Sequence, residues 1–148
     1  MARLRFELIT AERVLYRDEV DLVVAPSVEG QVAILPNHAP LLAVLEPGEV
    51  MVRKGTEETY MAITGGFLEV LANRVRVLAD AAERAEEIDV ERARRAMERA
   101  QEVLARQPAR QDLEEAMRAL RRAQVRIQVA RRRRGIPPGP TPPEEHRV

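Results

Sequence analysis

The sequence predicts an α+β protein in which an antiparallel β-sandwich is followed by an antiparallel hairpin of two helices. Up to about residue 80, short apolar runs alternate with turn signals. After residue 79 the composition changes to alanine, glutamate and arginine. The 148 residues suffice for one compact domain with an appendage. We expect a sandwich over residues 1–84, a helical hairpin over 85–134 and a proline-rich, disordered tail over 135–148.

The first half has the rhythm of a sandwich or barrel. The apolar runs 21–25, 32–35 and 41–45 are β-branched or leucine-rich and too short for helices. Polar and apolar residues alternate in 59–63 and 74–78, as in strands with one buried face. Turn signals recur about every seven to ten residues. They fall at Glu29-Gly30, Pro47-Gly48, Lys54-Gly55, Gly65-Gly66 and Ala72-Asn73. We expect two packed sheets.

The second half shows helical periodicity in two segments. In the first, apolar residues recur at spacings of three and four. They are Val90, Ala93, Met97, Ala100 and Leu104. Gln107-Pro108 interrupts this pattern.

A second helix is expected to begin at Asp112, with Glu115 three residues later completing an approximate capping box. Its apolar stripe is predicted to comprise Leu113, Met117, Leu120, Gln124 and Ile127, with Ala116 and Ala123 alongside. Alanine at many contact positions would let the helices approach closely. A hairpin of two such helices has no core beyond one seam, so it must lean on the sandwich, a partner or a ligand.

Composition excludes several classes of function. The chain has no cysteine, and two histidines are too few for a histidine metal site, so no metal site is expected. All four aromatic residues lie in the first half, which disfavours an arginine-rich RNA-binding adaptor because single-stranded nucleic acids stack on aromatics. No nucleophile–base set or glycine-rich phosphate loop is present, so an enzyme is the least supported option.

No apolar run approaches the roughly 20 residues needed to span a bilayer, and the N-terminus lacks a signal-peptide pattern. We therefore expect a soluble, cytoplasmic protein without direct membrane insertion, which a partner could hold at a membrane.

At the junction of the two halves lies the segment Ile88-Asp89-Val90-Glu91-Arg92-Ala93. Asp89 can cap a helix, and the free N–H groups of a helix start beside an arginine suit a phosphate. The same residues fit an ordinary helix start equally well.

The charge pattern of the hairpin is uneven. Residues 83–115 hold ten acids and seven arginines, whereas residues 116–134 hold eight arginines and no acid. Either the two helices pair their charges along the hairpin, or the second helix meets an anionic partner such as a nucleotide or an acidic protein surface. Like charges at this density repel one another in an isolated helix.

Helical geometry favours a nucleotide near the junction. Arg92 and Arg99 are seven residues apart and lie within about 20° of each other on one helix. Arg122 and Arg126 share a face of the other helix, whose end returns beside Asp89. Arginine forks match phosphate oxygens in pairs. Glu83 and Asp89 could accept hydrogen bonds from an amino group or a ribose hydroxyl.

The segments 29–42, 47–50, 65–70 and 77–80 occur in the order and spacing of a known family. With the helical hairpin that follows, residues 2–134 resemble the epsilon subunit of bacterial F-type ATP synthases. Ala33 and Asn37 stand where many relatives have glycine. Several motifs in register are more specific than any one of them.

The resemblance implies a non-catalytic subunit of the central rotor stalk of a proton-translocating ATP synthase. Its sandwich would bind the gamma subunit and the c-ring, with loops around Glu29, Gly30, Gln31 and His38 facing the ring. Such a subunit lies peripherally on the cytoplasmic face of the cell membrane, as part of the complex.

The resemblance also implies an ATP site. The family's nucleotide motif matches Ile88, Asp89, Arg92 and Ala93, and further family arginines match Arg99, Arg122 and Arg126. ATP would be a regulatory ligand; no cofactor is required, and a role for magnesium is left open.

In relatives the ATP-bound hairpin is compact. Without ATP it extends along gamma, and its basic second helix meets an acidic segment of the beta subunit, or of alpha, and inhibits ATP hydrolysis. The matching contacts would be Arg118, Arg121, Arg122 and Arg126. The alternative is a constitutive rotor subunit whose hairpin never moves.

Overall fold

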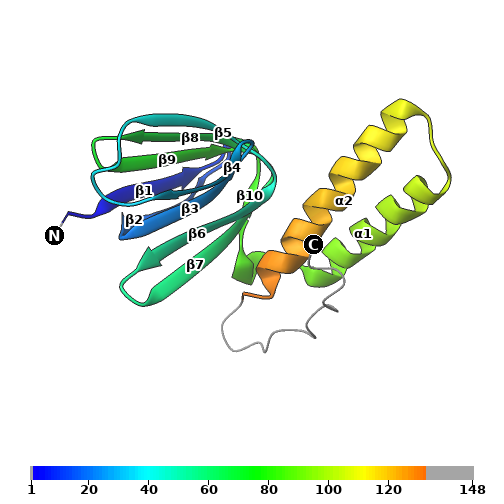
Figure 1. The fold of residues 1–148 in the computed structure, drawn as a ribbon. Coiled ribbons are helices and arrows are strands. Elements are labelled where there is room, and N and C mark those ends of the chain that lie inside the picture. Colours follow the sequence, from blue (N-terminus) through cyan, green and yellow to red (C-terminus); the bar gives the residue numbers. More distant parts are fainter. Residues whose placement is uncertain (1, 133–148) are drawn as a thin grey trace, which may run out of the picture.

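The computed structural model describes residues 2–132 (Figure 1). The expected tail and the last two arginines of the basic run, at 133 and 134, lie outside the described residues. Ten strands come first: β1 (Leu4–Ile9), β2 (Val14–Val20), β3 (Leu22–Ser27), β4 (Gly30–Ile34), β5 (Leu41–Leu45), β6 (Gly48–Lys54), β7 (Glu57–Ile63), β8 (Gly66–Leu71), β9 (Arg74–Ala79) and β10 (Ala82–Arg84). The 3₁₀-helix η1 (Ala85–Glu87) leads into α1 (Val90–Ala105) and α2 (Arg110–Ala130).

The strands form a sandwich, as predicted. Their order is β10-β7-β6-β3-β5-β8-β9-β1-β2, and β4 pairs with the other edge of β3. Only the pair Ser27–Leu45 joins β3 to β5, so the sheet folds over there into two layers. β1 and β9 run parallel, an exception to the expected antiparallel pairing. This is possible because the rest of the sandwich connects the two strands, so no tight turn is needed.

The core lies between the two layers and follows the alternation along the strands. On β1, Leu4, Phe6 and Leu8 are fully buried, whereas the intervening residues face outward. β9 does the same with Val75 and Val77. The sandwich therefore has a complete hydrophobic core without the hairpin.

The second helix begins two residues earlier than predicted. Its N-cap is Ala109, which makes no side-chain capping bond, and Asp112 lies inside the first turn. The chain reverses at Gln107, which has φ +50°, and the helix starts as soon as the backbone leaves Pro108. The Asp112 carboxylate still favours the helix through its dipole rather than as a cap.

The predicted stripe of α2 is also wrong in part. The seam between the helices consists of alanines: Ala93 and Ala100 of α1, and Ala116 and Ala123 of α2. Met117 is 56% exposed, and Leu113 and Gln124 are exposed as well. Small side chains let the two backbones approach closely, which displaces the larger residues to the side of the hairpin.

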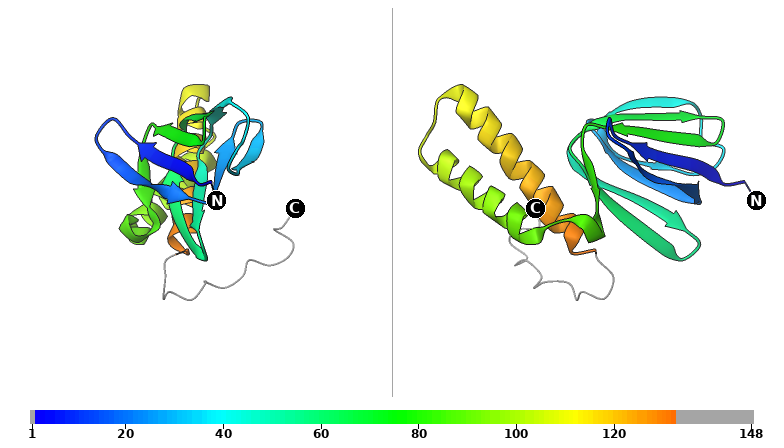
Figure 2. Two further views of the ribbon diagram at one scale, coloured as in Figure 1. Left: turned by 90° about the vertical axis from the view of Figure 1, so that its left-hand side faces the viewer. Right: turned by 180° about the vertical axis from the view of Figure 1, so that it is seen from behind.

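The hairpin touches the sandwich only at its root. The end of α2 packs on β6, β7 and η1, while the turn between the helices points away from the sandwich (Figures 1 and 2). A small apolar cluster lies at this contact, and we call it the root cluster. Its buried members are Ala62, Ala85, Ile88, Val129 and Ala130.

Replacing Gly66 by alanine should destabilise the sandwich by roughly 2–4 kcal/mol. Gly66 has φ +140°, and a Cβ atom there would collide with the carbonyl oxygen of Leu78. Gly55→Ala is the matched control, since Gly55 also has positive φ but open space around it, and it should lose only about 1 kcal/mol. Urea unfolding measures both; equal losses would contradict the close packing of β8 on β9.

Candidate functional site

Asp89 caps α1, as predicted. Its backbone is extended (φ −83°, ψ 99°), and its carboxylate accepts a hydrogen bond from the Arg92 amide at 3.0 Å. The Ala93 amide donates to the Asp89 carbonyl at 3.0 Å. The cap therefore satisfies one of the free donors at the helix start without any ligand.

A cavity of about 600 Å³ lies between the hairpin root and the edge formed by β7 and β10. α1 contributes Arg92, α2 contributes Arg122 and Arg126, and β10 contributes Glu83. Four of the predicted nucleotide residues thus line one space. The antiparallel return of α2 beside the start of α1 brings them together.

The charges in this cavity are unequal. Arg126 donates from Nε and Nη2 to the two carboxylate oxygens of Glu83, at 2.6 and 3.1 Å. These side chains are 23% and 32% exposed. Within residues 2–132, Arg92 and Arg122 form no ion pair. The cavity therefore offers two unpaired guanidiniums and one that is already shared, a surplus of positive charge suited to an anion.

Of the four motif residues only Arg92 lines the cavity; Asp89, Ile88 and Ala93 do not. Ile88 is only 2% exposed and packs in the root cluster. Ala93 is fully buried within α1, one helical turn after the cap. In this state both serve packing.

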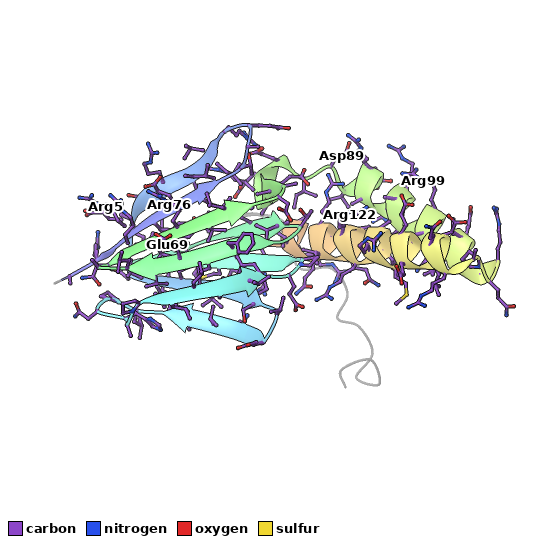
Figure 3. All side chains as sticks on the ribbon, turned by 90° about the horizontal axis from the view of Figure 1, so that it is seen from above. Arg5, Glu69, Arg76, Asp89, Arg99 and Arg122 are labelled. Atoms are coloured by element: carbon purple, nitrogen blue, oxygen red, sulfur yellow. The ribbon has the colours of Figure 1, made fainter. Side chains whose placement is uncertain are left out.

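Arg99 is also separate from the others. It lines a second cavity, of about 630 Å³, between the outer halves of the helices. Arg122 borders both cavities. Figure 3 shows Asp89 at the start of α1, Arg99 further along it and Arg122 on the neighbouring helix. The predicted group of four arginines is thus divided between two spaces.

The predicted rotor loops lie at opposite ends of the sandwich. Gly30 occupies the β3–β4 turn with φ +124°, where Ser27 donates from Oγ to the Gly30 carbonyl at 2.5 Å. This end adjoins the hairpin, because Ser27 pairs with Leu45 and Leu45 with Gly66. His38 lies at the other end, where the Asn37 amide donates to the Asn73 side chain at 2.6 Å in the β8–β9 turn.

The outer face of β5, β8 and β9 carries an apolar row that sequence reasoning missed. Val44 pairs with Phe67, and Phe67 with Leu78. These three side chains are each about half exposed; Phe67 is 52% exposed. Apolar residues on both faces of neighbouring strands are the signal that could have revealed this row.

Beside the apolar row runs a charged row. Glu69 pairs with Arg76 across β8 and β9, and Glu7 lies opposite Arg76 on β1. Figure 3 shows Glu69 and Arg76 on this face, with Arg5 further along β1. The Arg76 Nε atom is buried and has no hydrogen-bond partner among the described residues.

Two further ion pairs tie the hairpin root to the sandwich, and sequence reasoning missed these as well. Arg121 lies 3.0 Å from Glu46, and Arg132 lies 3.4 Å from Glu49. The guanidinium of Arg132 also stands 4.8 Å from the centre of the Tyr60 ring. Burial raises the pKa of Glu49, and the neighbouring Arg132 partly opposes this shift. Glu46 lies in the β5–β6 turn and Glu49 at the start of β6, far from α2 in sequence. Only the folded structure brings these acids next to α2.

Of the four arginines predicted for an inhibitory contact, two are engaged and two are open. Arg121 and Arg126 pair with Glu46 and Glu83. Arg118 and Arg122 are exposed.

Among the described residues, no helix is long and apolar enough to cross a membrane. Likewise, the described part of the chain has no group of three or more histidine or acidic side chains placed to hold a metal ion.

A β-sandwich followed by a two-helix domain is the architecture of the delta/epsilon chains of ATP synthase, and two family models match it. Residues 3–85 match the beta-sandwich domain of the ATP synthase delta/epsilon chain, and residues 86–131 match its long alpha-helix domain. The chain belongs to the ATP synthase delta/epsilon chain family.

Curated relatives carry the name ATP synthase epsilon chain. One, from Herpetosiphon aurantiacus, is 54% identical over 132 residues, which cover 88% of this chain and 96% of that protein. Another, from Dehalococcoides mccartyi, is 51% identical over 139 residues, covering 93% and 99%. The predicted resemblance to the epsilon family is confirmed.

A solved structure supports the fold. A chain in the Euglena gracilis mitochondrial ATP synthase, described as OSCP/F1/c-ring, aligns with a TM-score of 0.75 at 24% identity. The alignment covers 84% of this chain and 79% of that chain.

Replacing Asp89 by alanine should destabilise the hairpin by about 1 kcal/mol, because an N-terminal donor of α1 loses its acceptor. Asp89→Asn keeps an acceptor and should stay within a few tenths of a kcal/mol of the wild type. Urea unfolding followed by the helical circular dichroism signal measures both. Equal stability of the alanine variant and the wild type would contradict the capping role.

Proposed function

We propose that this chain is the epsilon subunit of an F-type ATP synthase, a non-catalytic part of the central rotor stalk on the cytoplasmic face of the cell membrane. The observation that carries the proposal is the near full-length identity, above half, to proteins named ATP synthase epsilon chain. The sandwich couples rotation between the gamma subunit and the c-ring, and the hairpin restrains ATP hydrolysis.

The outer face of β5, β8 and β9 is the surface we assign to the gamma subunit. Val44, Phe67 and Leu78 offer exposed apolar area beside a charged row, the composition of a protein interface with an apolar centre and a polar rim. The loops at Gly30 and His38 are the candidates for ring contact; since they lie at opposite ends of the sandwich, one end at most faces the ring.

The cavity at the hairpin root is the site we assign to ATP. Arg92 and Arg122 are unpaired there and can take phosphate oxygens, while Arg126 can join them by leaving or sharing Glu83. A nucleotide held between sandwich and hairpin favours the compact state only by its differential affinity for the two hairpin positions.

When the hairpin leaves the sandwich, the arginines of α2 become free to meet an acidic surface of the beta or alpha subunit. Arg118 and Arg122 are already exposed in the compact state. Arg121 and Arg126 would join them after losing Glu46 and Glu83. Release of these two cations doubles the number of open arginines from two to four, which favours the contact in the extended state.

Arg92→Ala should weaken ATP binding by the isolated chain about tenfold or more, since a hydrogen bond to a charged group contributes about 1.5–3 kcal/mol. Arg95→Ala is the matched control. Arg95 is also an exposed arginine of α1, but it is not among the residues that line the cavity beside Glu83. Isothermal titration calorimetry measures both. No heat at millimolar ATP from the wild type would remove the sensor role and leave the rotor role intact.

Phe67→Asp should weaken binding to the gamma subunit at least about tenfold, because it places a charge in the apolar row. The control is Leu113→Asp, which alters an exposed leucine of the hairpin instead. Co-purification of gamma with each variant, followed by titration, gives the comparison. Unchanged affinity of the Phe67 variant would assign gamma to another face.

A further inference from the structure

The face of α2 that meets the sandwich has arginines on both sides of an apolar ridge. Val125 and Val129 form the ridge and pack in the root cluster. At 100° per residue, Arg121 falls on one side of Val125; Arg132 lies in the turn just beyond α2, beside Glu49. Arg122 and Arg126 fall on the other side, where the candidate ATP cavity lies. The ridge thus separates two surroundings with different charge.

On the side away from the ATP cavity, the sandwich presents carboxylates. Glu46, in the turn between β5 and β6, lies 3.0 Å from Arg121. Glu49, at the start of β6, lies 3.4 Å from Arg132, whose guanidinium also stands over Tyr60 at 4.8 Å. Both acids line a cavity of about 400 Å³ whose α2 wall includes Arg121. We call Glu46 and Glu49 the acidic seat.

Close backbone packing fixes the positions of the two acids of the acidic seat. Gly48 separates the two acids, and a Cβ atom there would lie 2.8 Å from the Pro26 ring. Only glycine lets the β5–β6 turn pass so close to β3, which fixes both carboxylates at the root of α2. Neither acid lines the ATP cavity.

We propose that the acidic seat holds the hairpin in its compact position without nucleotide, by occupying the arginine surface that an acidic partner subunit would otherwise bind. The proposal rests on the inhibitory role given under Proposed function. With the hairpin in place, Arg121 lies against the sandwich and shares its charge with Glu46, so the seat and a partner carboxylate compete for it. Two interactions therefore stabilise the compact position from opposite sides of α2. The acidic seat is always present, whereas ATP acts only when its concentration is high enough for it to bind.

The competition has two consequences. Individually, partly exposed ion pairs are weak. The seat therefore shifts the equilibrium toward the compact position but does not prevent the hairpin from leaving. Loss of the seat lowers the fraction of chains in the compact state, and the apparent affinity for ATP falls by that same fraction although the ATP cavity is unchanged.

The test follows the departure of the hairpin from β7. Ala62 is 5% exposed and belongs to the root cluster, and the chain has no cysteine of its own. The thiol introduced by Ala62→Cys therefore reacts faster with a thiol reagent when the hairpin leaves, and the difference in rate between variants reports openings. The rate is measured on the full chain without nucleotide, in the Ala62→Cys background and with Glu46→Gln/Glu49→Gln added.

The seat variant should react about threefold faster or more. The control is Glu19→Gln/Glu69→Gln, which removes two acids from the sandwich face away from the hairpin and should leave the rate unchanged. Raising the salt concentration should speed the parent more than the seat variant, which among the described residues keeps only the Arg126–Glu83 pair between α2 and the sandwich. A seat variant that reacts at the control rate would overturn the proposal. Since no nucleotide is present, absence of ATP binding to the parent would remove the sensor role without touching this result.

Discussion

The contact between the end of α2 and the edge of β6 and β7 is the constraint on which the rest of the structure depends. The two helices share a seam of alanines, which bury little apolar surface. The larger side chains of α2, such as Met117, face solvent instead. The hairpin therefore owes its position to its root, where a few apolar side chains, three ion pairs from the end of α2 and the turn after it, and the Arg13–Glu87 pair act together.

The sandwich and the hairpin differ in what stabilises each of them. The sandwich encloses a full core and fixes its turns by close packing, so it offers a rigid platform. The hairpin has one narrow attachment with a charged cavity on each side. An element held by a small contact can leave as a unit, since few buried groups are lost when it does. This asymmetry suits a subunit in which one part binds a rotor while the other changes position.

Sequence patterns predicted the features that depend on interactions between residues close together in the chain. Alternation and turn signals indicated the sandwich, and Asp89 was correctly identified as a cap because capping involves only neighbouring residues. The start of α2 was misplaced at Asp112, since an acid in the first turn resembles a cap. The exposed side of α2 was also misassigned in part: alanines were expected at the contact, but Leu113 and Met117 were placed there with them and are exposed.

The long-range parts of the site could not be predicted in this way. Arg126 meets Glu83 across 43 positions of sequence, and no local pattern pairs them. Glu46 and Glu49 lie near a turn that points at α2 only after folding. The same holds for Arg99, which shares a helix face with Arg92 in projection but lines a different cavity.

The claim that hairpin position controls hydrolysis is tested most directly by a disulfide across the root. Ala62→Cys and Ala130→Cys place the only two thiols of the chain in one buried cluster. ATP hydrolysis is then measured for the assembled ATP synthase with the disulfide formed and reduced. The account predicts faster hydrolysis with the disulfide formed, because the arginines of α2 stay at the sandwich. An unchanged rate would contradict it and leave a constitutive rotor subunit whose hairpin does not move.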